Sequence, residues 1–123
     1  MPSMYKRVGG AATVKRIVAE YHEGLSGVPY FSSRFENTDM EELADRHRRF
    51  LTWVLDGPAA FDSAEDRRRV AERRLPPEAF DGAMSVLRSV LDRHLGGSAD
   101  IEHVMRAVQR REPLIVNPDD EDG

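Results

Sequence analysis

The chain has 123 residues, which fits one domain with a single buried core. Hydrophobic residues make up 40% of it, but no apolar run approaches the roughly 18 residues that would indicate a membrane span. Cysteine is absent, which excludes disulfides, thiolate catalysis and cysteine-held metal sites, so His, Asp and Glu remain as metal ligands. The net charge is −4, and acidic residues gather at positions 119–122, which leaves a near-neutral, arginine-rich body and disfavours nucleic-acid binding.

The first residues carry charges at Lys6 and Arg7 with no apolar stretch behind them. No secretory signal is therefore readable, and we expect a cytoplasmic protein with no membrane partner.

Apolar residues recur at helical spacing after Gly9 and Gly10, which predicts an amphipathic helix that ends at residues 27–29. The stripe consists of Val14, Ile17, Val18, Tyr21, His22 and Leu25. The next residues, 30–37, are typical of a short connector in which Phe31 and Phe35 are buried anchors.

A second amphipathic helix is predicted after residues 38–41 (TDME), which have the form of a capping box. In that motif the Thr38 hydroxyl accepts from a first-turn amide and Glu41 reaches back to the cap. The apolar stripe consists of Met40, Leu43, His47, Phe50, Leu51 and Val54. Gly57 suits a left-handed cap and Pro58 cannot continue the hydrogen-bond ladder, so this helix should end at residues 56–58.

The second half of the chain predicts three more helices. Residues 63–74 favour a short and mostly exposed one, because arginines leave it almost no apolar face. After Pro76 and Pro77 comes the longest stripe: Phe80, Ala83, Met84, Leu87, Val90, Leu91 and Leu95. A last helix opens near Ser98 and carries Ile101, Val104, Met105 and Val108. We therefore predict an all-α domain over residues 1–116 and a disordered acidic tail over residues 117–123.

The order and spacing of these motifs resemble the truncated, or two-over-two, haemoglobins over about residues 4–116. The resemblance rests on residues 5–10 (YKRVGG), on Phe35 followed by residues 38–43 (TDMEEL), on residues 50–51 and 55–58 (FL and LDGP), and more weakly on residues 75–80 (LPPEAF). It implies a truncated-globin-like two-over-two helical sandwich. It also implies a haem between the helix after the connector and the short exposed helix, with Phe35 stacked on the porphyrin.

Val70 falls where this family carries the proximal histidine that binds the iron. The spacing from the Gly-Pro break and the spacing to Phe80 both lead to this position, and Arg74 replaces the glycine that commonly follows. Valine has no lone pair to offer iron. Residues 59–79 contain no His, Cys, Tyr or Met, so a shift in register does not supply a substitute.

Two histidines stand out on the other side of the implied pocket. The resemblance places His22 where relatives commonly carry the tyrosine that hydrogen-bonds dioxygen, and His47 at a distal-helix position often held by glutamine. Either histidine alone is typical of a hydrogen-bonded core residue. Because both lie on apolar stripes of separate helices, a bound ligand or metal is as good an interpretation as packing. We expect His47 to be the replacement iron ligand, with His22 beside it as a hydrogen-bond donor.

The remaining candidates are ranked lower. Arg46 either pairs with a haem propionate, because arginine suits carboxylates, or is a solvated side chain beside Arg48 and Arg49, which is the stronger interpretation. His94 and His103 are expected to be solvent-facing or structural, and Tyr21 and Trp53 to be core or rim aromatics. The predicted haem-binding residues are His22, Phe35, Leu43, Arg46, His47, Val70 and Phe80.

Three functions compete at this point. The first is a haem-binding globin that binds dioxygen, nitric oxide or a similar small ligand, with His47 on the iron and an open face for dioxygenase- or peroxidase-like side activity. The second is a haem-free globin-like module with a regulatory or interaction role and a small-molecule cavity, acting on a protein partner or as a homodimer. The third, rated low, is a non-haem metal site of His22, His47 and a carboxylate. No catalytic triad or phosphate loop is recognisable, so a binding protein is favoured over an enzyme.

Overall fold

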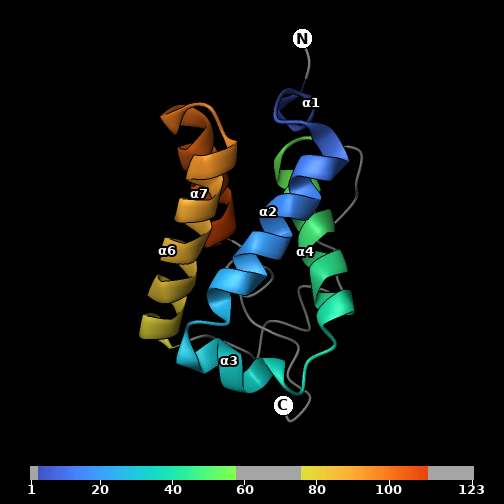
Figure 1. Ribbon diagram of the computed structural model, residues 1–123. Coiled ribbons are helices and arrows are strands. Elements are labelled where there is room, and N and C mark those ends of the chain that lie inside the picture. The colour runs from blue at the N-terminus through green and yellow to red at the C-terminus, as the bar shows by residue number, and fades with distance from the viewer. Residues whose placement is uncertain (1–2, 58–75, 111–123) are drawn as a thin grey trace.

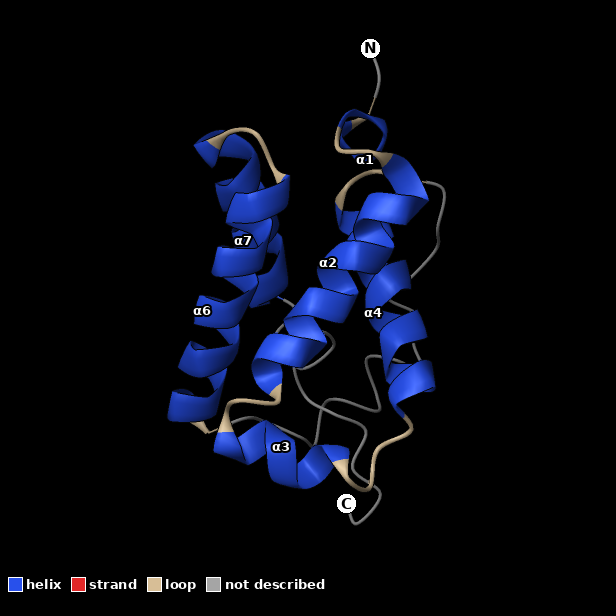
Figure 2. Ribbon diagram, viewed as in Figure 1, coloured by secondary structure: helices blue, strands red, loops and turns tan. Residues whose placement is uncertain are grey.

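The computed structural model describes residues 3–57 and 76–110, and every regular element in these two ranges is an α-helix (Figures 1 and 2). The helices are α1 (Met4–Arg7), α2 (Gly10–Leu25), α3 (Pro29–Phe35), α4 (Met40–Val54), α6 (Pro77–His94) and α7 (Ser98–Arg110). The all-α prediction is confirmed. None of these described helices is long and apolar enough to cross a lipid bilayer.

Helix α2 lies at the centre of the described fold. It packs against α4 and also against α6, and α6 in turn packs against α7. Figure 1 shows the resulting pairs, α2 with α4 and α6 with α7, while α3 crosses beneath them. This is the predicted two-over-two arrangement.

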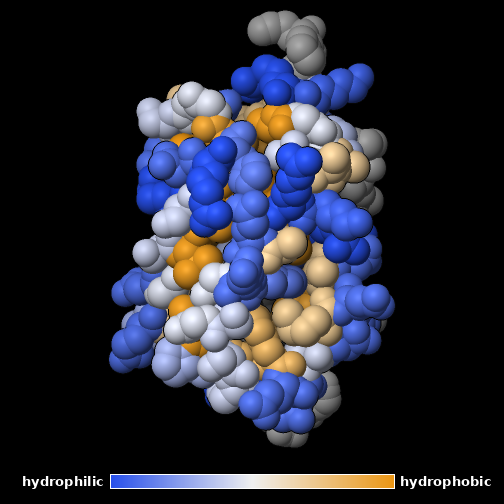
Figure 3. Space-filling view, viewed as in Figure 1, coloured by the Kyte–Doolittle hydropathy of each residue, from blue (hydrophilic) through white to orange (hydrophobic). Residues whose placement is uncertain are grey.

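The core forms from the apolar stripes that the sequence predicted. On α2 the buried residues are Val14, Ile17, Val18, Tyr21 and Leu25. On α6 they are Ala79, Ala83, Met84, Leu87, Val90 and Leu91, and on α7 the four predicted apolar residues are all buried. Figure 3 shows the complementary outer surface, where hydrophilic side chains cover most of the visible face and apolar atoms appear between them. Burial of one face of each helix therefore holds the pairs together.

The connector prediction is wrong in part, because residues 29–35 form helix α3. Pro29 occupies the first turn, where its fixed φ favours a helix and its missing N–H is not needed. Phe31 is completely buried, as expected, and its ring lies 6.1 Å from that of Phe35. Phe35 is only half-buried, so it is a weaker anchor than predicted.

The cap of α4 lies one residue later than predicted. Asp39 is the N-cap, and its carboxylate accepts a hydrogen bond of 3.2 Å from the backbone N–H of Glu42. The Thr38 hydroxyl instead donates to the carbonyl of Arg34 at 2.8 Å. A carboxylate at the N-cap also interacts favourably with the helix dipole, which explains the preference for Asp39.

The end of α4 also differs from the prediction. The left-handed residue is Asp56, with φ 65°, and not Gly57. Gly57 is needed for another reason: a Cβ there would lie 2.7 Å from the Tyr5 ring and 2.7 Å from the Thr52 methyl group. The backbone N–H of Tyr5 donates to the carbonyl of Leu55 at 2.9 Å, so this close approach docks α1 onto the end of α4.

Helix α7 begins at Ser98, as predicted. Helix α6 begins at Pro77, so this proline is its first residue and not part of the interruption that the sequence analysis expected before the stripe. Three further predictions lie outside the described residues: the short exposed helix at 63–74, the position of Val70 and the acidic tail at 117–123.

A glycine sets the distance between α2 and α6. A Cβ built on Gly24 would lie 2.5 Å from Cγ1 of Val86. Valine is stiff at χ1, so it cannot turn this methyl group away at low cost. The two helices therefore depend on Gly24 for their close contact.

We expect Gly24→Ala to lower the free energy of unfolding by about 1–2 kcal/mol, because overpacking outweighs the better helix propensity of alanine. Urea unfolding monitored by circular dichroism measures the change. The double variant Gly24→Ala/Val86→Ala should recover most of the loss. Gly27→Ala is the matched control, since its Cβ would contact only a carbonyl oxygen at 3.4 Å. An equal loss in Gly27→Ala would contradict the packing argument.

Candidate functional site

Two histidines meet between α2 and α4. Nε2 of His22 lies 2.7 Å from Nδ1 of His47, and the ring centroids are 4.9 Å apart in an edge-to-face arrangement. His47 is 1% exposed, whereas His22 is half-buried. The sequence predicted that both imidazoles would point into a shared space, and the structure brings them into direct hydrogen-bonding contact.

Both imidazoles are neutral at pH 7. Burial lowers the pKa of His47 well below its ordinary value, and a proton on His22 or the charge of Arg46 lowers it further. Burial, followed by the charge of Arg48, lowers the pKa of His22 to about 4. In a neutral imidazole one nitrogen carries a proton and the other a lone pair. One histidine of the pair therefore donates and the other accepts.

Two buried polar atoms near this contact have no hydrogen-bond partner among the described residues. They are Nε2 of His47 and the hydroxyl oxygen of Tyr21. Tyr21 is 1% exposed, and burial raises the pKa of its phenol, so the hydroxyl stays protonated. Buried polar groups are nearly always paired in native proteins. Two exceptions in adjacent side chains mark this region as a candidate site.

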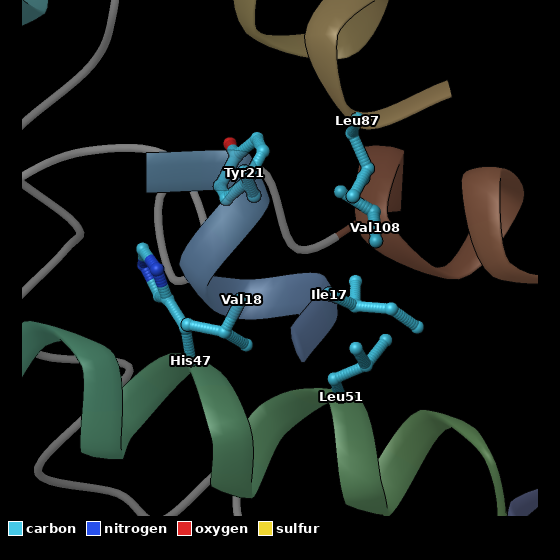
Figure 4. A pocket seen from close by; sticks show the side chains of 7 residues that line it. All are labelled: Ile17, Val18, Tyr21, His47, Leu51, Leu87 and Val108. Atoms are coloured by element: carbon cyan, nitrogen blue, oxygen red, sulfur yellow. The ribbon is translucent and has the colours of Figure 1, made fainter. Parts of the chain in front are cut away.

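Tyr21 and His47 line the same small cavity where four helices converge (Figure 4). Its other walls are the apolar side chains Ile17, Val18, Leu51, Leu87 and Val108. The cavity has a free volume of about 10 Å³, close to what one water molecule needs and far below the roughly 300 Å³ of a typical ligand pocket. It suits a water or a diatomic molecule, and a porphyrin bound at His47 would have to lie outside this cavity.

The other predicted haem contacts are distributed around the histidine pair. The ring of Phe35 lies 6.2 Å from that of His22. Leu43 is buried on α4, one turn before His47, and Phe80 is half-buried on α6. Val70 lies outside the described residues, so the structure leaves that position untested.

The structure contradicts the stronger of the two interpretations of Arg46, which was a solvated side chain. Arg46 is only 6% exposed. The neighbouring Arg48 and Arg49 do lie at the surface, where both form ion pairs with Asp45. Arg46 thus places a buried positive charge beside His47, where it contributes to the lowered pKa of that imidazole.

The remaining histidines lie away from this pair, as predicted. Nε2 of His94 contacts the Glu20 carboxylate at 3.1 Å, and Arg93 contacts the same carboxylate at 2.9 Å, so this group links α6 to α2. His103 is exposed. Within the residues that the structure describes, no group of three or more His, Asp or Glu side chains could hold a metal ion, and no carboxylate joins the His22–His47 pair.

Tyr21 is the residue that the sequence analysis undervalued, because it was interpreted as a core or rim aromatic. Its burial agrees with that interpretation, but its unpartnered hydroxyl does not. The available signal was its position on the same apolar stripe as the histidine that follows it. An aromatic ring at such a position looks the same in sequence whether or not its hydroxyl finds a partner.

Acid should destabilise the protein through the histidine pair. In the unfolded chain the imidazoles titrate near 6.5, whereas His22 in the folded chain titrates at about 4. Below pH 6.5 the unfolded chain binds more protons, so the free energy of unfolding falls as the pH drops through this window. For His22 alone, the loss at pH 5 is about 2 kcal/mol, and His47 adds a loss of the same sign.

Urea unfolding at pH 7 and pH 5 measures this effect. The double variant His22→Phe/His47→Leu should lose less stability between the two pH values than the wild type does. The variant of the exposed His103, His103→Gln, is the matched control and should keep the wild-type pH dependence. The same pH dependence in the double variant as in the wild type would contradict the assignment.

Removing the Tyr21 hydroxyl should stabilise the haem-free protein. We expect Tyr21→Phe to raise the free energy of unfolding by about 1 kcal/mol, because a buried hydroxyl without a partner loses its hydration on folding and regains nothing. Thermal and urea unfolding provide the measurement. Tyr30→Phe, at a half-buried position, is the control and should change stability by less than about 0.5 kcal/mol. A destabilised Tyr21→Phe would show that the hydroxyl is paired in solution.

Comparisons with known proteins agree with this arrangement. The truncated haemoglobin of Tetrahymena pyriformis, in its Fe(III) form, has a TM-score of 0.75 and 20% identity, and the match covers 94% of this chain and 100% of that one. The 2/2 haemoglobin of Synechococcus sp., in the cyanomet state with covalently attached haem, has a TM-score of 0.72 and 23% identity, covering 93% and 98%. A truncated haemoglobin from Chlamydomonas reinhardtii has a TM-score of 0.71 and 23% identity, covering 95% and 97%.

These structural likenesses establish the shared fold. No curated protein matches the chain in sequence. The model of one protein family, described as bacterial-like globin, matches residues 3–117. Because that match spans nearly the whole chain, including α1 to α7, the protein belongs to the bacterial-like globin family.

Proposed function

We propose that this globin binds haem and that Nε2 of His47 ligates the iron, in place of the proximal histidine that Val70 replaces. One observation carries the proposal: a buried imidazole whose Nδ1 contacts His22 and whose Nε2 has no partner within the described ranges. Imidazole nitrogen is the usual axial ligand of globin haem. An unpartnered buried nitrogen of this kind is what a missing metal partner would leave behind.

The electrostatics of the pair support this role. A histidine must be neutral to bind a metal, because the ligating nitrogen needs its lone pair. The lowered pKa values keep both His22 and His47 neutral at pH 7 and well below it. Proton competition for His47 is therefore weaker than for an exposed histidine.

The surrounding side chains supply the other contacts that a haem requires. In our proposal Phe35, Leu43 and Phe80 are apolar contacts of the porphyrin, and Arg46 is the cation for a propionate. Arginine is suited to this task because its planar guanidinium binds carboxylates with two parallel hydrogen bonds. Its burial beside His47 would strengthen such a pair relative to one in open solvent.

We propose dioxygen, nitric oxide or a similar small molecule as the ligand. Haem iron, when bound, supplies the coordination position for such molecules. Separately from that position, the cavity lined by Tyr21 and His47 has a free volume of about 10 Å³, enough for a molecule of this size. Its apolar walls favour an uncharged molecule. A dioxygenase- or peroxidase-like activity would be secondary to binding.

The small cavity also favours a second candidate, a haem-free globin-like module with a regulatory or interaction role. The cavity can hold a small uncharged molecule without any porphyrin, and Val70 removes the usual reason for haem affinity. In this alternative the protein acts in the cytoplasm on a protein partner or as a homodimer. The histidine pair then has only a structural role, in which each ring provides a hydrogen-bond partner for one nitrogen of the other.

A haemin titration followed by absorption spectroscopy separates the two candidates. We expect the wild type to show a sharp Soret band at one haem per chain, because the imidazole of His47 would hold the iron. His47→Gly should broaden or shift that band, and free imidazole added to His47→Gly should restore it by occupying the vacated volume. Circular dichroism of the haem-free variant confirms that it is folded.

His94→Gln is the matched control, because it alters another half-buried histidine that lies outside the site. It should bind haemin with the wild-type spectrum. A wild-type protein that shows only the broad band of loosely associated haemin would overturn the haem proposal and favour the haem-free module. A sharp band that is unchanged in His47→Gly would retain the haem but move the iron ligand to another residue.

A further inference from the structure

His22 occupies a different environment from the histidine it contacts. It is half-buried, so part of its ring meets solvent, while its Nε2 faces Nδ1 of His47 at 2.7 Å. The rings of Tyr21 and Phe35 lie 5.9 Å and 6.2 Å from it and limit its movement. The inclination of 68° between the two imidazole planes is an edge-to-face arrangement that a single N–H···N hydrogen bond can span.

Two proton arrangements are compatible with this contact. In the first, His22 donates from Nε2, His47 accepts at Nδ1, and the proton of His47 lies on Nε2. In the second, His47 donates from Nδ1 and His22 accepts, which leaves Nε2 of His47 as a bare lone pair. At the unpartnered Nε2 of His47, the first arrangement buries an N–H group and the second buries a lone pair.

The second arrangement is the better one for this environment. It avoids an orphaned buried N–H group at Nε2 of His47, and such groups are rare in native proteins. Only the second arrangement leaves His47 able to bind a metal through Nε2.

We infer that His22 is a positioning residue: its Nε2 accepts the Nδ1–H of His47, which fixes the tautomer of His47 and directs its Nε2 lone pair to the cofactor side. The inference rests on the proposed function in one respect, since that function supplies the metal that uses the lone pair. It revises the sequence prediction, which made His22 a donor beside the iron. It also explains why the histidines lie on neighbouring helices at hydrogen-bonding distance and not merely in the same core.

The choice of partner has a chemical consequence. Metal-binding histidines usually donate their second N–H to a carboxylate, a carbonyl or a water. Here the acceptor is a neutral imidazole, which places no negative charge behind the ligand. The positive charge of Arg46 lowers the pKa of His47, and that of Arg48 lowers the pKa of His22, so both arginines also make the pair less basic. His22 therefore orients His47 without making it as basic as a carboxylate would.

The tautomer can be measured without any haem. In the ¹⁵N-labelled, haem-free protein at pH 7, long-range ¹H–¹⁵N correlation spectra distinguish a protonated ring nitrogen from a bare one. We expect His47 to carry its proton on Nδ1 and His22 to have a bare Nε2. In His22→Phe, which removes the acceptor, His47 should become a mixture of both tautomers. His22→Gln, whose amide oxygen can accept, should restore the Nδ1–H form, and His103→Gln should leave it unchanged. Observation of His47 protonated on Nε2 in the wild type overturns the inference.

Haemin affinity gives a second and separate readout. Loss of an orienting partner typically weakens metal binding about 10–100-fold, so His22→Phe should raise the dissociation constant of haemin by about that factor. His22→Gln should return it to within a few-fold of the wild type. If the wild type binds no haemin but carries the Nδ1–H tautomer, the proposed function fails and the positioning role stands. If haemin binds with equal affinity to the wild type and His22→Phe, the positioning role fails and the haem proposal stands.

Discussion

The hydrogen bond between His22 and His47 is the constraint on which the organisation of this globin depends. A buried imidazole that lacks a partner costs about 1–3 kcal/mol, so His47 could not lie alone between α2 and α4 without a considerable loss of stability. The 2.7 Å contact satisfies one nitrogen of each ring and leaves Nε2 of His47 unpartnered. The same contact fixes the rotation of α4 relative to α2, because both rings must face each other.

Close packing around α2 makes that constraint effective. Gly24 allows α6 to approach α2 on one side, and the histidine pair ties α4 to α2 on another. With α2 held on two sides, Tyr21 cannot turn its hydroxyl to solvent without leaving the core, where it is 1% exposed. The unpartnered hydroxyl is thus a consequence of how tightly the helices pack, and closely packed interiors do not relax to accommodate one group.

The apolar periodicity was sufficient to predict the main helices, because each long helix buries a single face and so carries a stripe at helical spacing. It failed at residues 29–35, where Ser and Pro suggested a connector although Pro29 in fact begins a helix. It also misplaced the α4 cap by one residue, since Thr38 and Asp39 are both good caps and the geometry of the preceding turn decides between them. Within the site, the inward direction of both histidines followed from their stripes. Their direct contact and the unpartnered Tyr21 hydroxyl did not, because both depend on the distance between helices.

Placement of an iron ligand on α4 changes how cofactor binding would couple to folding. A metal that binds only the folded chain stabilises it in proportion to the logarithm of its concentration relative to the dissociation constant. Under our proposal the metal would stabilise α4, which also buries Phe50 and Leu51 in the shared core. Because His47 contacts His22, it would also stabilise the packing of α4 against α2. The haem-free chain already holds His47 in place by this packing, so little ordering is needed before the metal binds. Such preorganisation lowers the cost of binding, and under our proposal it would offset part of the affinity lost with the proximal histidine.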